Sequence, residues 1–356
     1  MRSSLIVQLL LGSSASLTSC SVLPSTALAL SPRNNELDKP AINPPFSEEV
    51  QDRHFRIDFP PRPWRHEVWP RGWLPKSCVE EAEYNHLDPV DFEAVDVRFR
   101  DCAVEWTVCR HKKSDQSWIS TLDTLSAVPV GMRQYISNLV LLPGQAALPS
   151  EAASGQGKKV AAAYTRGAVL VFTPSYFKLG VLFHEITHIL DTTTLRALLV
   201  AHGYRATTPF SETKFWRQAY GNDSAVPTPY SKASWQEDFA DAGRWAMSHY
   251  TREKGLAEYS RGWRGCRTQI AAFQAWMGDI IFPRGGVCMG KIPGSKAVRV
   301  GSHVPGSRPP GKTSMGSFSH NGLRKGISKG QVNEIVIPRG VDQLVFVYEG
   351  PVPNWG

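Results

Sequence analysis

The stretch from Phe183 to Asp191, FHEITHILD, carries the most specific chemical pattern in the sequence. Four residues advance a helix by about 400°, so His184 and His188 would lie on one face about one turn apart. Two imidazoles placed in this way can bind one metal ion. Glu185 completes a His-Glu-x-x-His pattern, in which the glutamate can act as general base for zinc-bound water. The pattern predicts a zinc site if a third ligand exists.

That third ligand must come from elsewhere in the chain, because a catalytic zinc ion usually has three protein ligands and one water molecule. A histidine about ten residues after His184 is excluded, since the next histidine after His188 is His202. A glutamate from a later helix is the remaining option, and Glu237 fits it. Asp241 follows four residues later, so the two carboxylates would share a helix face. One would bind the ion, while the other accepts the free N–H of a zinc-bound imidazole.

Glu237 also has a simpler explanation. Ser234-Trp235-Gln236-Glu237 is a capping box, in which the glutamate satisfies a backbone N–H at the start of a helix and is not available to bind metal. Asp238 is the alternative ligand if the helix begins one residue later. A further alternative is that the two histidines form an ordinary helix face and bind no metal.

Together these residues resemble the glutamate zincins, the gluzincin peptidases. The resemblance implies that His184, His188 and Glu237 are ligands of a Zn²⁺ cofactor. It also implies that Glu185 is the general base and that Asp241 accepts a hydrogen bond from His184. The activity implied is hydrolysis of a peptide or protein substrate.

Tyr230 lies seven residues before Glu237, in PTPYSKASWQEDFADA. This spacing, followed by an aromatic residue and alanine, is similar to the toxin-type gluzincins related to anthrax lethal factor. That resemblance implies that the Tyr230 phenol donates a hydrogen bond to the oxyanion of the tetrahedral intermediate. Burial of the ring is the alternative explanation for a tyrosine in a proline-rich loop.

Longer segments resemble the conidiation-specific secreted proteins of filamentous fungi. The matching segments are FRDCAVEWTVCRH, VPVGMRQYISNLV, FHEITHILD and YGNDSAVPTPYSKASWQEDFADAGRWA, between about residues 95 and 247. The resemblance implies a secreted fungal protein with a zincin-like domain. The alternative function is a catalytically inactive zincin-fold protein, associated with conidiation or the cell wall, with a structural zinc or no metal. A fourth protein ligand such as Asp191 or His202 would favour a structural role, and an open fourth position would favour an enzyme.

The N-terminus has the layout of a secretory signal peptide over residues 1–29. Arg2 precedes the apolar run Leu5 to Leu11, and a small-residue stretch ends at Ala27-Leu28-Ala29. A bacterial lipoprotein box at Leu17 to Cys20 is the alternative, although the apolar run ends well before Cys20. No later run reaches the roughly 18 continuous apolar residues that a membrane span needs. We therefore expect a secreted, extracellular protein without a membrane span.

Cysteine usage fits an oxidising compartment. Signal cleavage would leave an odd number of cysteines, so we expect two disulfides and one free thiol. Cys266 and Cys288 form a plausible pair because they flank the same predicted helix, although the sequence leaves the connectivity open. No Cys-x-x-Cys spacing indicates a zinc site. The five are Cys78, Cys102, Cys109, Cys266 and Cys288.

The formal net charge of +8 is concentrated in residues 291–330, which contain eight Lys and Arg and no acidic residue. This Gly/Ser/Pro-rich tract predicts a flexible, disordered linker. It lacks the regular interleaving of aromatic residues that single-strand binding requires, so we expect no nucleic-acid partner. Residues 331–356 form a tail in which VNEIVIP and DQLVFVY could pair as a hairpin.

The remaining chain divides into a Pro/Trp-rich extension over residues 30–75, expected to be extended, and a zincin-like domain over residues 76–290. Gly167 to Pro174 predicts a strand that leads into the His184 helix, and its segment Ala168 to Phe172 is the expected pairing site for an extended substrate. Further helices are expected from Ser234 towards His249 and from about Thr268 to Phe282. The apolar stripe of the last helix, which we expect to pack in the core, is Ile270, Phe273, Met277 and Ile280.

The expected fold class is α+β. A small, mostly antiparallel sheet would pack on the His184 helix, with the Glu237 helix facing it across a cleft. We expect the protein to be a monomer.

Overall fold

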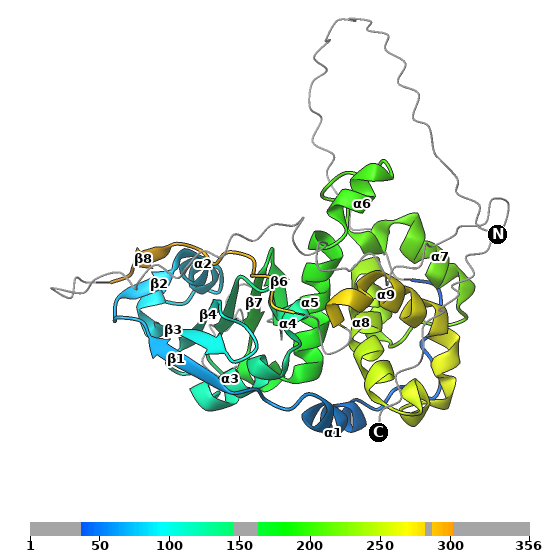
Figure 1. Cartoon of the computed structure of the whole chain (residues 1–356), viewed down its shortest axis with the longest axis horizontal. Coiled ribbons are helices and arrows are strands. Elements are labelled where there is room, and N and C mark those ends of the chain that lie inside the picture. The colour runs from blue at the N-terminus through cyan, green and yellow to red at the C-terminus, as the bar shows by residue number, and fades with distance from the viewer. Residues whose placement is uncertain (1–36, 145–162, 282–286, 302–356) are drawn as a thin grey trace, which may run out of the picture. The chain divides into compact units, whose positions relative to one another are not determined.

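The computed structural model describes residues 37–144, 163–281 and 287–301 of the 356-residue chain (Figure 1). All three ranges belong to one unit that begins at Glu36. The predicted signal peptide, the predicted C-terminal hairpin and residues 302–330 of the basic tract lie outside the described residues.

A six-stranded mixed sheet forms one layer of this unit, with the strand order β1-β3-β4-β5-β7-β6. Antiparallel pairing joins β1 to β3, β3 to β4 and β6 to β7, whereas β4, β5 and β7 run parallel. The sheet is therefore small, as expected, and mixed. The strands are β1 (Trp64–Val68), β3 (Phe92–Phe99), β4 (Glu105–His111), β5 (Asn138–Leu141), β6 (Ala163–Arg166) and β7 (Val169–Phe172).

The predicted strand at Gly167 to Pro174 corresponds to β7, and it lies in the interior of the sheet. β5 pairs with one side of β7 and β6 pairs with the other. The prediction that a substrate pairs with Ala168 to Phe172 is therefore wrong, because β7 has no unpaired edge. Within the described residues, β6 is the edge strand at this end of the sheet.

Helices pack on both faces of the sheet, because alternating strand residues belong to two separate hydrophobic clusters that each include helical residues. They also supply both functional segments predicted from the sequence. The predicted helices at His184, Ser234 and Thr268 correspond to α5, α8 and α9. The stripe on α9 packs in the core as expected, with Ile270, Phe273 and Met277 buried and Ile280 partly buried. The helices are α1 (Glu48–Asp58), α2 (Lys76–Tyr84), α3 (Trp118–Ala127), α4 (Val130–Arg133), α5 (Leu179–Thr193), α6 (Arg196–Ala201), α7 (Lys214–Asn222), α8 (Trp235–Thr251) and α9 (Arg267–Ile281). Among short 3₁₀ turns, η5 (Phe210–Glu212) and η6 (Tyr230–Ala233) lie beside α8.

α5 is the central helix of the fold, because it contacts β6 of the sheet and the helices α1, α3, α4 and α8 (Figure 1). Its apolar residues Phe183, Ile186 and Ile189 are completely buried. They belong to one continuous hydrophobic core that includes residues from the strands, α8 and α9. Burial of this kind stabilises a side chain by about 1.5–3 kcal/mol, so the core fixes the position of the helix that carries the histidines.

α1 contradicts the expectation that residues 30–75 are extended without helices. The prolines that flank this helix most closely are Pro45 and Pro60, which leaves residues 46–59 free of proline. Ser47 caps the helix by accepting from the backbone N–H of Val50, and acidic residues occupy the first turn. Phe55 of α1 then packs edge-on against Phe183 of α5, with ring centroids 5.1 Å apart. The extension is thus part of the core.

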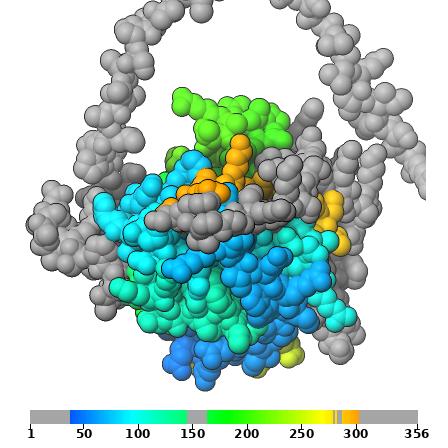
Figure 2. All heavy atoms as spheres, turned by 90° about the vertical axis from the view of Figure 1, so that its left-hand side faces the viewer, coloured from blue at the N-terminus to red at the C-terminus, as the bar shows by residue number. Residues whose placement is uncertain are grey.

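Residues 287–301, here called the C-terminal strap, contradict the expectation that the basic tract is disordered from Lys291 onward. The backbone N–H of Ile292 donates to Gln134 O at 2.8 Å, and that of Lys76 donates to Lys296 O at 2.8 Å. β8 (Ala297–Arg299) pairs antiparallel with β2 (Trp73–Pro75). In Figure 2 the orange atoms of the strap lie against cyan atoms of the earlier chain. Tertiary hydrogen bonds therefore order a segment whose composition alone predicts flexibility.

The disulfides match the expected number but not the suggested pair. Cys78 bonds to Cys109 and Cys102 bonds to Cys288, while Cys266 is a buried free thiol. The suggested Cys266–Cys288 pair is wrong. α9 holds its two ends about 22 Å apart, at about 1.5 Å per residue, and the strap then carries Cys288 towards the sheet. The Cα atoms of a disulfide must lie within about 7 Å of each other.

The longest helix in the described ranges is α8, with 17 residues. None of the helices there combines the length and the apolar composition that a bilayer-spanning helix requires.

Candidate metal centre

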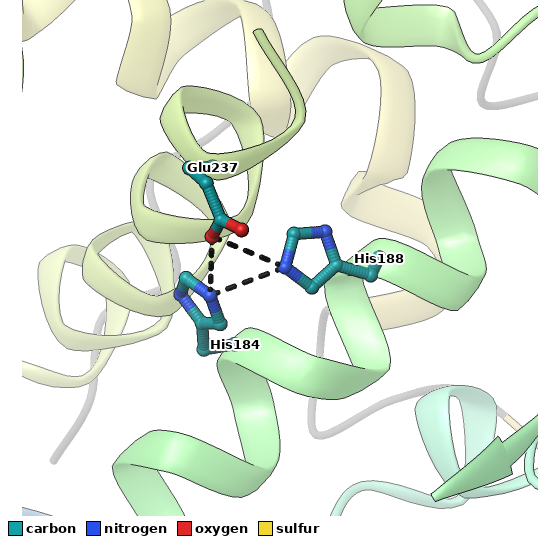
Figure 3. A group of neighbouring side chains, drawn as sticks. All are labelled: His184, His188 and Glu237. Carbon is teal, nitrogen blue, oxygen red and sulfur yellow. Dashed lines mark hydrogen bonds and ion pairs between the residues drawn. The ribbon is translucent and has the colours of Figure 1, made fainter. Parts of the chain in front are cut away.

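Three side chains from α5 and α8 converge with their metal-binding atoms facing one another (Figure 3). His184 Nε2 lies 3.2 Å from His188 Nε2 and 3.0 Å from Glu237 Oε2. His188 Nε2 lies 3.3 Å from the same carboxylate oxygen. The structure therefore brings together the three residues that the sequence predicts as ligands.

The triangle has the dimensions of a zinc site. In a tetrahedral centre with Zn–N and Zn–O bonds of about 2.0–2.1 Å, neighbouring ligand atoms lie about 3.3 Å apart. The three observed separations are close to this value. Two neutral imidazoles and one carboxylate are also a ligand set that zinc uses in catalytic sites. Among the described residues this is the one group of three or more His, Cys, Asp and Glu side chains that could hold a metal ion.

Local structure explains why the two histidines meet. Their four-residue spacing on α5 places both rings on the face towards α8, where they pack edge-on with centroids 4.8 Å apart. His184 is buried, and 17% of the His188 side chain is exposed. The pair is thus held by the helix and still borders solvent.

Glu237 reaches the site from the first turn of α8, and its position resolves the capping alternative. Ser234 is the N-cap, and its Oγ accepts from the backbone N–H of Glu237 at 3.2 Å. The Glu237 carboxylate is directed at the histidines. One hydrogen bond of the capping box therefore forms, from the Glu237 backbone N–H to Ser234 Oγ. The reciprocal bond, in which the Glu237 carboxylate would accept from the Ser234 backbone N–H, is replaced by the contacts with the histidines. Asp238, the alternative ligand, is buried on another side of α8, where it accepts from Trp216 Nε1 at 2.9 Å.

Asp241 makes the contact with His184 that the sequence predicts. His184 Nδ1 donates to Asp241 Oδ1 at 3.0 Å, so the lone pair of Nε2 faces Glu237 and His188 when the imidazole is neutral. Burial lowers the pKa of His184, but the hydrogen bonds to Asp241 and Glu237 outweigh burial and raise it to about 10. Burial raises the pKa of Glu237, and the hydrogen bonds from the two histidines outweigh it and lower the pKa to about 2. A cation that binds here must displace the proton of His184.

Glu185 lies beside the triangle without joining it. Its side chain is buried, and burial raises the pKa of the carboxyl group, while His184 and His188 oppose that change. A carboxylate with a raised pKa next to a metal site is a better proton acceptor than one in water.

Tyr230 lies beside His184, on η6. Its ring centroid lies 5.8 Å from that of His184, and 59% of the residue is exposed. The alternative of a buried core tyrosine is therefore wrong. Partial burial of the phenol, followed by the charges of Glu237 and Glu185, raises its pKa to about 12, so the hydroxyl keeps its proton at neutral pH.

The two suggested fourth ligands lie elsewhere. Asp191 accepts two hydrogen bonds from Ser211, one from the backbone N–H and one from Oγ, each at 2.7 Å. His202 packs against the ring of Phe215, with centroids 5.2 Å apart. In the part of the chain that the structure describes, the group of candidate ligands therefore has three protein members.

Sequence reasoning missed two residues of the site, Thr228 and Ser231. Both side-chain hydroxyls donate to Asp241 Oδ2. The signal in the sequence is the run Thr-Pro-Tyr-Ser, which predicts a turn. Nothing in the run indicates that the turn closes on a carboxylate of the next helix.

Comparison with known proteins identifies the family. The model of the conidiation-specific protein Con-13 family matches residues 55–260, more than half of the chain. Conidiation-specific protein 13 of Neurospora crassa is 28% identical over 207 residues, which are 55% of this chain and 54% of that protein. The chain thus matches about half the length of this curated relative.

A comparison with solved structures adds no argument about the fold. The M1 zinc metallopeptidase of Deinococcus radiodurans matches 61% of this chain and 45% of its own, with 10% identity and a TM-score of 0.22. That score is too low to establish a shared fold. The family match over residues 55–260 includes α5, η6, α8 and the whole candidate site. The chain belongs to the conidiation-specific protein Con-13 family.

Proposed function

We propose that this protein is a secreted zinc-dependent metallopeptidase. One observation carries the proposal: the metal-binding atoms of His184, His188 and Glu237 form a triangle with sides of 3.0 to 3.3 Å. The neighbouring residues Glu185 and Tyr230 are the types that peptide hydrolysis requires beside such a centre.

The two imidazole nitrogens and one carboxylate oxygen suit zinc, and zinc chemistry defines what a bound ion would contribute to hydrolysis. When bound by the three side chains, zinc would lower the pKa of a bound water molecule towards about 7 and polarise a substrate carbonyl group. Asp241 holds His184 in the tautomer that leaves Nε2 available.

Two residues of the chain move or hold protons in this proposal. The Glu185 carboxylate accepts the proton of the attacking water and delivers it to the leaving amine. The Tyr230 hydroxyl, whose pKa is raised to about 12, remains protonated and donates a hydrogen bond to the oxyanion. Neither residue belongs to the group of candidate ligands, so both remain available for these tasks.

Peptide substrates have a surface on which to bind. β6 contacts α5 and has β7 as its neighbour on one side, which leaves a strand edge on the other within the described residues. An extended peptide can add to such an edge through backbone hydrogen bonds. We therefore assign substrate binding to β6 in place of β7.

The secreted location is part of the proposal. Two disulfides form within the described residues, and disulfides persist mainly in oxidising compartments. The signal-peptide layout of the first 29 residues also supports export from the cell.

A comparison of the wild type with two variants tests the activity. The purified protein, loaded with one equivalent of zinc, is expected to cleave casein or members of a peptide library. Glu185→Gln should bind zinc equally and lose most of the activity, because the amide cannot accept the proton. Glu253→Gln, at an exposed position, controls for the loss of a negative charge. Equal cleavage by the wild type and Glu185→Gln would exclude the proposed base.

The second candidate function is that of a secreted protein that binds zinc at this site for stability and has no catalytic activity. It is favoured by the family match, because the relative's name refers to a stage of development and to no reaction. In this case zinc would raise the thermal stability of the protein, and no peptide would be cleaved by either the wild type or Glu185→Gln.

A further inference from the structure

The Asp241 carboxylate connects the candidate metal centre to the loop before α8. Oδ1 accepts from His184 Nδ1 at 3.0 Å. Oδ2 accepts from Ser231 Oγ at 2.9 Å and also from Thr228 Oγ1. Asp241 and Ser231 are buried, so these contacts are shielded from solvent. The carboxylate is thereby held on both sides, and rotation about its terminal bond would break three hydrogen bonds.

The protons of the two hydroxyl groups can be assigned from their partners. The Thr228 oxygen accepts from the backbone N–H of Tyr230 at 3.1 Å and from that of Ser231 at 3.2 Å. The Ser231 oxygen accepts from the backbone N–H of Thr228 at 3.1 Å. Each hydroxyl has one proton to give, and Asp241 is the acceptor that remains for both. The Thr228–Ser231 oxygen contact of 3.3 Å then needs no shared proton.

This arrangement also fixes Tyr230. The residue lies between the two hydroxyl-bearing positions, and its own N–H is bound by Thr228 Oγ1. Its ring is largely exposed, so packing alone does not hold it over His184. The closed turn on Asp241 restrains its backbone, and a side-chain hydrogen bond with Glu237 adds a restraint on the phenol. One buried carboxylate therefore holds the ring of His184 on one side and the turn that carries Tyr230 on the other.

We propose that Thr228 and Ser231 are positioning residues, which hold Asp241 against His184 and Tyr230 above the metal centre as one unit. This inference rests on the proposed zinc site and names the residues that tune it. A turn closed by Thr and Ser side chains is common in loops. The difference here is that both hydroxyl groups donate their hydrogen bonds to a carboxylate outside the turn, and that carboxylate contacts the candidate ligand His184.

Zinc affinity of the full chain, measured by competition with a chromophoric chelator, tests the proposal without any assay of activity. Thr228→Val keeps the shape and removes the hydroxyl, and should weaken zinc binding about tenfold to a hundredfold, the range for loss of an outer partner. Ser231→Ala should act in the same direction, and Thr228→Ser should bind like the wild type. Thr213→Val removes a buried hydroxyl that donates to Phe210 O, outside the site, and should leave the affinity unchanged.

A double-mutant cycle shows whether Thr228 acts through Asp241. In an Asp241→Asn background, Thr228→Val should cause little further loss of zinc affinity, because the acceptor it orients is already altered. Melting of each variant without zinc separates lost affinity from lost folding. Wild-type affinity in Thr228→Val and Ser231→Ala, or an undiminished effect of Thr228→Val beside Asp241→Asn, would overturn the inference and leave the zinc site standing. Failure of the wild type itself to bind zinc would remove the proposed metal centre.

Discussion

Glu237 Oε2 lies 3.0 Å from His184 Nε2, although 53 residues separate the two in the chain. Close packing of α5 against α8 makes this contact. Gly243 of α8 lies directly against α5, where an added Cβ would be 2.7 Å from Thr187 Cγ2 and 2.7 Å from the ring of Phe273. Thr187 stands between the two histidines on α5. The geometry of the candidate site therefore depends on a glycine that contributes no ligand.

Gly243→Ala is expected to disturb this packing. The methyl group would force α8 away from α5 or from α9, at a cost of about 1–3 kcal/mol. The variant should melt at a lower temperature and bind zinc more weakly. Gly278→Ala on α9 is the matched control, because a Cβ there meets no atom within 4 Å. It should be neutral or stabilising by up to about 1 kcal/mol, since alanine is the better helix former. Equal zinc affinity in both variants would contradict the dependence on Gly243.

The paired charges of the site predict how the stability of the zinc-free protein depends on pH. The pKa of His184 is raised from 6.5 to about 10, so its contribution is complete below pH 6.5 and is lost as the pH rises towards 10. The pKa of Glu237 is lowered from 4.5 to about 2, so its contribution is present above pH 4.5 and is lost as the pH falls towards 2. These two groups together stabilise the protein most between pH 4.5 and 6.5. Melting curves of the wild type and Glu237→Gln should differ most between pH 4.5 and 6.5 and converge as the pH falls towards 2.

Zinc binding should release protons for the same reason. At pH 8 the raised pKa of His184 keeps a proton on the ring, and that proton must leave when a metal ion takes its place. Titration calorimetry in buffers with different ionisation enthalpies counts the protons released. We expect one proton per zinc ion from His184 at pH 8, and a further release of up to one proton from the water that the bound ion would acidify. A binding enthalpy that is the same in every buffer would show that His184 does not exchange a proton for the metal.

Tyr230→Phe separates a role in turnover from a role in metal binding. Loss of the phenol should lower kcat by roughly a hundredfold, the range for removing an oxyanion donor, while the zinc affinity stays the same. Tyr204→Phe is a suitable control, because that hydroxyl accepts from the backbone N–H of Lys214. An unchanged kcat in Tyr230→Phe would remove the proposed hydrogen bond to the oxyanion.

Export predicts a glycan at Asn222. Asn222-Asp223-Ser224 is the one Asn-x-Ser/Thr tripeptide in the sequence, and Asn222 is exposed at the end of α7. Asp223 is turned inward, where its carboxylate accepts from the backbone N–H groups of Thr268 and Gln269. Protein secreted from a eukaryotic host should lose mass on treatment with a glycosidase that cleaves N-glycans. Asn222→Gln and Ser224→Ala should show no such loss, and an unmodified secreted wild type would contradict the prediction.

Local patterns account for what could be predicted from the sequence. The spacing of His184, His188 and Glu185 within one helix follows from helix geometry alone, and Ser234 marks the start of α8 by its capping chemistry. Glu237 is favoured over Asp238 as the third ligand because, in a helix that starts after Ser234, Glu237 lies four residues before Asp241 and on the same face. These features depend on residues close together in the chain.

The features that were not predicted depend on contacts between distant segments. The strap is ordered because Lys296 O accepts from Lys76 N, and the disulfide at its start joins Cys288 to Cys102, 186 residues away in the sequence. β6 takes the edge position because β7 pairs on both sides. Composition and periodicity carry no information about such pairings. The Thr228 and Ser231 hydroxyls were missed for the same reason, since their acceptor lies on the following helix.

The zinc content of the purified chain tests the central claim most directly. Native mass spectrometry after exposure to zinc and removal of the excess should show one zinc ion per wild-type chain. The double variant His184→Ala, His188→Ala should show none, because a single carboxylate cannot hold the ion through that treatment. A wild-type chain without zinc, or a double variant that retains one ion, would contradict the account.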